Sequence, residues 1–398
     1  MKLTLPLLLL TLLAASAAAQ TFKVIHSFNF SDGSSPNGGL IRDAVGNFYG
    51  TTQLGGTSGR GIVFQLDPNN QETILYSFTG ASDGGIPIGR LIRDKAGNLY
   101  GVTSSGGDSA CSCGTVFKLA PKRTLTTLHR FKGGKDGAQN GGQPELGLVL
   151  IKGDLYGAAS FGGITGCDGN LGCGVIFKVT QTGKETVLYR FTAHADGGFP
   201  QDLTRDNAGN LYASTGGSYM QGNDGTIFKM DTTGKLTGLY TFTGGAVGNS
   251  PRWGLVHEAS GIIHGVTAFG GFTCSVASAG CGIVFTLDAT GKEHVLHAFG
   301  KQFRDGAEPS GRLVDVKGTL YGTTFFGGIE NSTCSFGCGI IYRVGGNSGK
   351  FTVLYRFTGG DDGWAPSGGL TEDAAGNLYG SAALGGSGNN GVIYLITP

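Results

Sequence analysis

The residues with the clearest chemistry in this sequence are eight cysteines, which fall in four close pairs. The pairs are Cys111 and Cys113, Cys167 and Cys173, Cys274 and Cys281, and Cys334 and Cys338. A Cys-x2-Cys zinc site is disfavoured because the spacing differs from pair to pair and no histidine joins any of them. The sequence therefore predicts four disulfides, each within one loop, formed in an oxidising compartment. Because each closes only a few residues, we expect them to order loops more than to stabilise the fold.

Seven histidines are the next candidates for catalysis or metal binding. Three of them stand where other repeats have Tyr76, Tyr189, Tyr240 or Tyr355, and a fourth replaces the tyrosine of the "GNLYG" segments; these four are His26, His129, His297 and His264. A strand position that accepts either ring is a packing position. The others, His194, His257 and His294, are far apart and lack ligand spacing. We expect no metal site and no cofactor.

Carboxylates offer two further chemistries, calcium binding and acid-base catalysis. Asp-Gly pairs recur a few residues before a proline, at Asp32, Asp83, Asp136, Asp196, Asp305 and Asp362. Ca²⁺ favours several oxygen ligands, but Asp-Gly before proline is ordinary turn chemistry, which is the interpretation we favour. The carboxylates that could serve catalysis together with His194 are Asp168, Asp224, Asp305 and Glu308. No spacing shows two of them within reach of one substrate, as general acid-base catalysis requires.

Five aromatic residues in glycine-rich segments are the candidates for ligand binding: Phe199, Trp253, Phe272, Phe336 and Trp364. Aromatic rings can stack on sugars or anchor a protein partner. Trp364, in "DDGWAPSGG", is the first to test, although an aromatic ring at this point also suits packing between repeats.

The elements that must position these residues come from a repeat. A phenylalanine ends an alternating segment every 50 to 60 residues, at Phe28, Phe78, Phe131, Phe191, Phe242, Phe299 and Phe357. Each repeat contains four short segments rich in β-branched and aromatic residues, such as "GRLIRD", "NLYGVT", "GTVFKL" and "LTTLHRF". An Asp-x-x-Gly-Asn element joins the first two as a tight hairpin. Each repeat is thus predicted to be a four-stranded sheet.

Four-stranded units of this length that stack radially make a β-propeller. The last repeat stops after three strands, and Phe22 to Phe28, "FKVIHSF", matches the missing fourth. We predict an all-β fold: a seven-bladed β-propeller of four-stranded antiparallel blades whose last blade is closed by the N-terminal strand. A parallel β-solenoid is the rival, but it would not need the split repeat.

The ordered string "DGxxP", "GNLYGxT", "GG", "CGxVFKL" and "ETVLYRF" resembles the Gloeo/Verruco (GloVer) repeat of secreted bacterial proteins, from Phe22 to Pro398. The fifth repeat departs most, with "SGIIHGVT" and no Asp-Gly before Pro251. The resemblance implies export and a propeller-like repeat, and it implies no activity.

Composition and the N-terminal segment indicate where the protein acts and which partners are unlikely. Residues 1–19 read as a signal peptide and residues 20–398 as a single propeller domain, secreted to the periplasm or the exterior. Lys and Arg total 29 against 28 for Asp and Glu, so nothing favours nucleic acid. We expect a monomer that does not span a membrane.

The long loops between the second and third strands and between blades share one face in a propeller, and function tends to sit on such loops. We therefore expect a secreted recognition scaffold that binds a glycan or a protein through this disulfide-loop face, and not an enzyme. Two alternatives stay open: an extracellular polysaccharide lyase or hydrolase that uses the loop carboxylates, and a structural surface-layer module.

Overall fold

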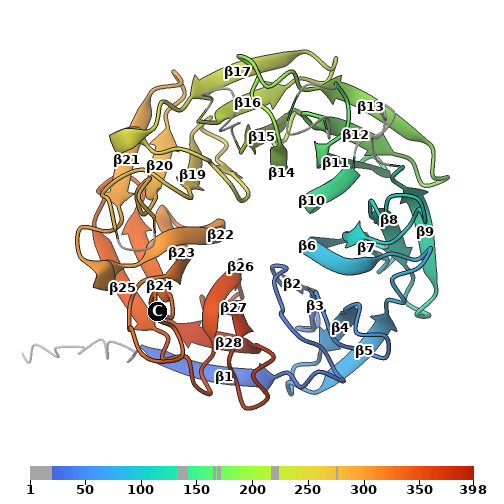
Figure 1. Ribbon diagram of the computed structural model, residues 1–398, viewed down its shortest axis with the longest axis horizontal. Coiled ribbons are helices and arrows are strands. Elements are labelled where there is room, and N and C mark those ends of the chain that lie inside the picture. The colour runs from blue at the N-terminus through green and yellow to red at the C-terminus, as the bar shows by residue number, and fades with distance from the viewer. Residues whose placement is uncertain (1–19, 133–141, 165–166, 168–171, 217–223, 275–276) are drawn as a thin grey trace, which may run out of the picture.

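The computed structural model describes residues 20–132, 142–164, 167, 172–216, 224–274 and 277–398. The signal peptide predicted for residues 1–19 lies outside the described residues. Across the described chain the fold is all-β and propeller-like, with the sheets standing in a ring around a central axis (Figure 1). The first strand of each sheet lies nearest the axis, and the last runs along the rim.

Listed from axis to rim, the described sheets have the following strands. The first three are β2 (Ile41–Arg42), β3 (Phe48–Thr52), β4 (Ile62–Leu66), β5 (Glu72–Ser77); β6 (Gly85–Arg93), β7 (Leu99–Ser105), β8 (Thr115–Leu119), β9 (Leu125–Arg130); and β10 (Gly142–Ile151), β11 (Asp154–Phe161), β12 (Val175–Val179), β13 (Glu185–Arg190). The next two are β14 (Pro200–Arg205), β15 (Leu211–Thr215), β16 (Thr226–Met230), β17 (Leu236–Thr241); and β18 (Val256–His257), β19 (Ile263–Thr267), β20 (Ile283–Leu287), β21 (Glu293–Ala298). The last two are β22 (Ala307–Val316), β23 (Thr319–Phe326), β24 (Ile340–Gly345), β25 (Phe351–Arg356); and β26 (Trp364–Glu372), β27 (Leu378–Leu384), β28 (Val392–Thr397), β1 (Thr21–Ser27). The part of the chain that the structure describes also has the short 3-10 helices η3 (Gly245–Val247) and η4 (Phe303–Asp305).

Two pairings depart from a simple series of hairpins. The N-terminal strand β1 lies antiparallel to β28, with Phe22 opposite Ile396 and Ser27 opposite Val392, so the two ends of the described chain share one sheet. The strands β6 and β10 meet in parallel at Arg90 and Gly147, which joins two sheets into one of eight strands. The sequence predicts the first pairing but gives no sign of the second.

The third strand of each sheet is buried because neighbouring sheets cover both of its faces. In β8, "TVFKL", every residue except Lys118 is buried, as expected for a strand without a solvent face. The glycine of "GNLYG" follows from this packing. A Cβ atom on Gly101 would lie 2.6 Å from the ring of Phe117, so the ring needs a residue without a side chain beside it.

The Asp-x-x-Gly-Asn element forms the expected hairpin between the first and second strands. The carboxylate of Asp43 accepts hydrogen bonds from the amides of Val45, Gly46 and Asn47 and from the hydroxyl of Tyr49. Burial works in the opposite direction, but these bonds hold the pKa of Asp43 below its usual value. The aspartate is therefore fully used by the turn.

The core is distributed among clusters between neighbouring sheets. The seven repeated phenylalanines are at most 2% exposed. Each meets an aromatic ring on the third strand of the next sheet at a centroid distance of 5.1–5.3 Å, as in Phe191 with Phe228 and Phe28 with Phe64. The contact between Phe28 and Phe64 joins the last sheet to the first, so the same packing continues across the chain ends.

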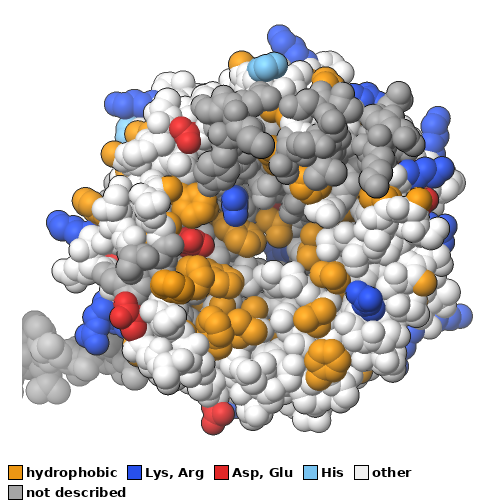
Figure 2. Space-filling model, viewed as in Figure 1, with side chains coloured by type: hydrophobic (Ala, Val, Ile, Leu, Met, Phe, Trp, Pro, Cys, Tyr) orange, Lys and Arg blue, Asp and Glu red, His pale blue; other side chains and the backbone are white. Residues whose placement is uncertain are grey.

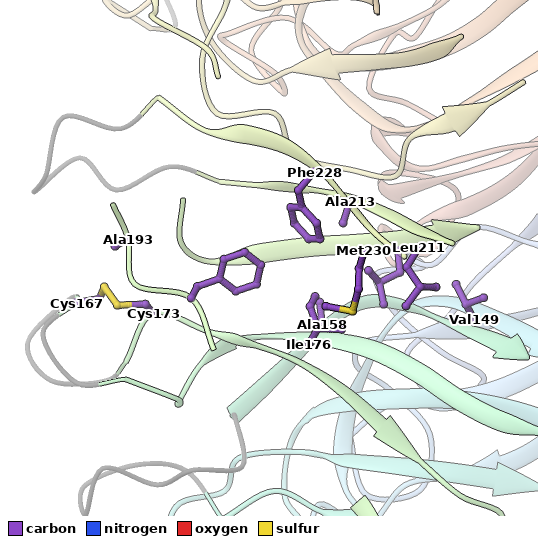
Figure 3. Packing of buried hydrophobic residues seen from close by; sticks show 12 residues of the cluster. Val149, Ala158, Cys167, Cys173, Ile176, Ala193, Leu211, Ala213, Phe228 and Met230 are labelled. Carbon is purple, nitrogen blue, oxygen red and sulfur yellow. A yellow bond between two sulfur atoms is a disulfide. The ribbon is translucent and has the colours of Figure 1, made fainter. Parts of the chain in front are cut away.

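All four predicted disulfides are confirmed, with Cα–Cα distances of 5.2–5.9 Å. Their position differs from the expectation of loop staples alone. Figure 3 shows Cys167 and Cys173 at one end of the cluster that contains Ile176 and Phe228. Cys334 and Cys338 likewise belong to the cluster between the last two sheets. These bridges therefore contribute apolar packing between sheets as well as loop order.

Candidate binding site in the central channel

One position in each repeat faces the central channel, and it holds either glycine or a charged residue. It stands two or three residues after the proline that enters the first strand and directly before a leucine: Gly39, Arg90, Gly147, Asp202, Gly254, Arg312 and Gly369. Four glycines leave space, and three long or charged side chains fill part of it. The repeats thus differ in charge at this channel position.

Two of the four glycines, Gly147 and Gly254, are required by charged neighbours. A Cβ atom on Gly147 would lie 2.6 Å from Oδ1 of Asp202, and one on Gly254 would collide with Oδ2 of Asp202 and lie 3.1 Å from Cδ of Arg312. Asp202 and Arg312 therefore rest against the bare backbone of adjacent first strands. An alanine at either glycine would displace one of these charges.

The two arginines are not neutralised by the aspartate. The Nη2 atom of Arg312 donates to Oγ1 of Thr204 at 3.0 Å. Among the described residues, neither guanidinium lies within 4.0 Å of the Asp202 carboxylate, and the side chain of Arg90 makes no hydrogen bond. With Asp202 ionised the three side chains sum to a charge of +1, and the donors on Arg90 are free for a ligand.

The charges of Arg90, Asp202 and Arg312 influence one another's pKa values. Enclosure by protein atoms, together with repulsion from Arg312, lowers the pKa of Arg90 to about 10, although Asp202 acts in the opposite direction. Arg90 thus stays a cation at neutral pH. Burial raises the pKa of Asp202, against the attraction of Arg312 and Arg90. Arg90 itself remains accessible to solvent, since it lines an open channel.

Two cavities meet at this cluster. One of about 760 Å³ and another of about 480 Å³ are both lined by Arg90, Asp202 and Arg312. The larger one extends past Trp253 to Glu258, and the smaller one to Arg42 and Arg93. Cavities of this size accommodate a small molecule or one to two sugar rings.

The end of the channel beside the Asp-x-x-Gly-Asn hairpins is charged asymmetrically. The smaller cavity reaches three arginines at the ends of β2, β6 and β14, and the larger cavity reaches three acids; they are Arg42, Arg93 and Arg205, and Glu258, Asp315 and Glu372. A ligand that enters here meets a positive side and a negative side. This favours one orientation of an asymmetric ligand.

The five aromatic candidates fall into three environments. Phe199 and Trp364 are half-buried and pack against clusters between sheets. Trp253 also packs against such a cluster and lines the larger channel cavity. Phe272 and Phe336 are 47% and 51% exposed. Phe199 and Trp364 therefore pack between sheets, Trp253 faces the channel, and Phe272 and Phe336 face solvent.

The carboxylates proposed for catalysis are dispersed. Asp305 ends η4 just before β22 and Glu308 is the second residue of β22, whereas Asp224 lies just before β16 in another sheet. Asp168 and Asp136 lie outside the described residues. The other Asp-Gly aspartates serve turns where tyrosine is present: Asp83 accepts from Tyr76 and from the amide of Thr79.

Sequence reasoning missed the channel cluster. The signal was present as a column, because the residue before the leucine of "PIGRL", "PQDL" and "PSGRL" is charged where "PNGGL" and "PSGGL" have glycine. A glycine in a glycine-rich repeat is normally interpreted as a turn residue. The alternation between glycine and a charged residue at this position therefore gains meaning only when the structure shows that the first strands converge on the channel.

Comparison with protein-family models identifies the family of the chain. The model of the Gloeobacter/Verrucomicrobia repeat matches residues 11–167 and 268–398. The chain belongs to this repeat family. A search of curated proteins finds no match.

Solved structures share the architecture of this Gloeobacter/Verrucomicrobia repeat protein. Virginiamycin B lyase from Staphylococcus aureus is 14% identical, with a TM-score of 0.60 over 95% of this chain and 100% of that one. The extracellular domain of a one-component system from B. thetaiotaomicron is also 14% identical, with a TM-score of 0.56 over 95% of this chain and 42% of that one. A puromycin hydrolase is 12% identical, with a TM-score of 0.51 over 89% and 51%. At this identity the similarities show the propeller-like fold alone.

The described residues include no helix with the length and apolar character to span a bilayer.

Proposed function

We propose that this protein is a secreted recognition scaffold that binds an acidic glycan through the central channel. The scaffold is a seven-bladed β-propeller in which β1 completes the last blade. The observation that carries the proposal is the channel column, where two arginines and one aspartate stand among four glycines.

The chemistry of the cluster suits a uronic acid residue. A guanidinium binds a carboxylate through parallel hydrogen bonds, which are stronger than bonds between neutral groups. Arg90 has free donors, and Arg312 retains donors beyond the one given to Thr204. The carboxylate of Asp202 is an acceptor for sugar hydroxyls. A carboxylate with hydroxyls a few bonds away satisfies all three side chains.

The disulfide-loop face extends the proposed contact. Phe272 and Phe336 are exposed aromatic rings on connections between second and third strands, where such rings could stack on further sugars or anchor a protein. On the face shown in Figure 2, hydrophobic side chains gather beside the central opening, over β22, β23, β26 and β27. The channel would supply charge recognition, and this face would supply additional contact area.

The proposal predicts selective binding of acidic sugars by the mature protein. We expect oligogalacturonate, oligoguluronate and hyaluronan fragments to bind with dissociation constants of ~10–100 μM, roughly the weak end of the affinity scale. Neutral dextran and cellulose fragments should bind at least ~10-fold more weakly, and binding of the acidic sugars should weaken as salt rises. Calorimetric titration measures both effects.

The same titrations separate the alternatives. Equal binding of neutral and acidic sugars, independent of salt, would contradict the channel proposal. Release of unsaturated or shortened products from the acidic fragments would show the lyase or hydrolase alternative.

A further inference from the structure

The rim of the ring carries a second repeated position, distinct from the channel. The His or Tyr near the end of each outermost strand lies beside the first or second residue of the outermost strand of the next sheet. Among the described residues, contacts join His26 with Glu72, His129 with Glu185, Tyr240 with Glu293, His297 with Phe351 and Tyr355 with Phe22, and the pairs Tyr76 with Leu125 and Tyr189 with Leu236 each pack against one shared cluster. We call these the rim pairs.

Tyrosine rim pairs are chemically complete when the partner is apolar. The hydroxyl of Tyr76 donates to Asp83 at 3.0 Å, and Tyr189 does the same with Asp196 at 3.0 Å. Leu125 then needs no polar partner. In these pairs the ring, the Asp-Gly aspartate and the apolar residue leave no unpaired group.

The rim pair of His26 and Glu72 is different. The ring nitrogen Nε2 of His26 lies 3.5 Å from Oε2 of Glu72, and the side chains are only 16% and 10% exposed. Both His26 Nε2 and Glu72 Oε1 are buried and have no hydrogen-bond partner. One ligand atom each from His26, Asp32 and Glu72 lies within 4.8 Å of the others. Two carboxylates and an imidazole thus converge, and the unsatisfied atoms belong to His26 and Glu72, whereas Asp32 already accepts hydrogen bonds from the backbone amide and the side chain of Asn29.

No lysine or arginine among the described residues forms an ion pair with Glu72 or Asp32. Two carboxylates this close, one of them nine-tenths buried, are costly unless a cation is present. A neutral imidazole nitrogen with carboxylate oxygens is a donor set used by Zn²⁺, which takes three protein ligands and leaves the remaining position to water. Ca²⁺ favours an all-oxygen set and fits less well.

We propose that His26, Asp32 and Glu72 form a binding site for a divalent transition-metal cation, Zn²⁺ in the first instance. The site bridges the chain ends, since His26 lies on β1 and Glu72 lies on β5 of the first sheet. A register shift in β1 between Val24 and His26 sets the ring on the side of the neighbouring sheet. The cation would tie the N-terminal strand to the sheet that follows it.

The pair His129 and Glu185 repeats part of the arrangement. Nε2 of His129 lies 3.6 Å from Oε2 of Glu185, and both residues again have an unpartnered buried atom. Because the corresponding Asp136 lies outside the described residues, we assign no site there. The number of metal ions bound per protein is therefore compared between the natural protein and each variant.

The test uses the mature protein, freed of metal by a chelator and then titrated with ZnCl2 or MnCl2. We expect Zn²⁺ to raise the melting temperature and to bind with micromolar affinity or better. Glu72→Gln preserves shape and should weaken Zn²⁺ binding at this site by ~100-fold or more, because the ligand charge is lost. The bound metal measured by mass spectrometry should fall by one equivalent.

A double variant copies a neighbouring rim pair. His26→Tyr with Glu72→Leu reproduces the Tyr76–Leu125 arrangement, so it should fold, keep the unliganded melting temperature within a few degrees and lose the same equivalent. Glu293→Leu, at a rim pair with tyrosine, is the matched control and should leave metal uptake unchanged. The proposal fails if Glu72→Gln binds as much metal as the natural protein, or if neither cation shifts melting of the natural protein.

Discussion

Deletion of residues 20–28 is expected to abolish the cooperative fold. This segment contains β1, whose backbone pairs with β28, and Phe28, which is fully buried against Phe64. Loss of one buried phenylalanine side chain alone costs ~3–5 kcal/mol, and domains have only ~5–15 kcal/mol of stability in total. Removal of the strand also exposes the edge of β28, which invites aggregation. Thermal unfolding followed by circular dichroism, with size-exclusion chromatography, measures both consequences.

The control is a protein that begins at Gln20 and retains β1. It should unfold cooperatively and elute as a single species. Addition of a synthetic peptide of residues 20–30 to the freshly refolded truncated protein should restore part of the cooperative transition. A truncated protein with the same melting temperature as the control would refute closure by the N-terminal strand.

Replacement of both channel arginines is expected to abolish binding of acidic sugars. Arg90→Gln and Arg312→Gln should each weaken uronate binding ~10-fold or more, since charge-assisted hydrogen bonds contribute ~1.5–3 kcal/mol each. The double variant should lose roughly 100-fold or more if the two contacts are independent. Calorimetric titration with oligogalacturonate provides the measurement.

Stability should move in a different direction from affinity. At Arg90 the repulsion from Arg312 outweighs the attraction of Asp202, so Arg90→Gln should leave the melting temperature unchanged or raise it slightly. Arg42→Gln is the matched control at the mouth of the smaller cavity, and it should change affinity less than ~3-fold. If Arg42→Gln weakened binding as much as Arg90→Gln and Arg312→Gln, a diffuse charge effect would explain the affinity and the specific site would be refuted.

The sequence predicts the sheet architecture well because the repeat is a local code. Each strand, each Asp-x-x-Gly-Asn hairpin and each cysteine pair is specified within a few consecutive residues, and the match between "FKVIHSF" and other fourth strands points to the pairing of β1 with β28. The four disulfides follow from the same locality, since no loop with one cysteine exists.

The channel site and the rim site escape prediction for the opposite reason. Arg90, Asp202 and Arg312 belong to different sheets and meet only because the first strands converge on one axis. In the sequence His26 is interpreted as a packing residue that replaces tyrosine. Its acidic partner Glu72 belongs to the next sheet of the ring, so the pair becomes visible only in the structure. For Trp364 the sequence emphasises binding, because a large ring stands in a glycine-rich segment. In the structure this ring packs against the buried cluster between sheets that contains Phe357 and Val392.

The most direct test of the acidic-glycan account is a crystal structure of the protein grown with D-galacturonate or a short oligogalacturonate. The account predicts a sugar in the channel, with its carboxylate within hydrogen-bond distance of Arg90 and Arg312 and a hydroxyl donating to Asp202. A sugar bound on the disulfide-loop face near Phe272 or Phe336, with the channel filled by water alone, would contradict it.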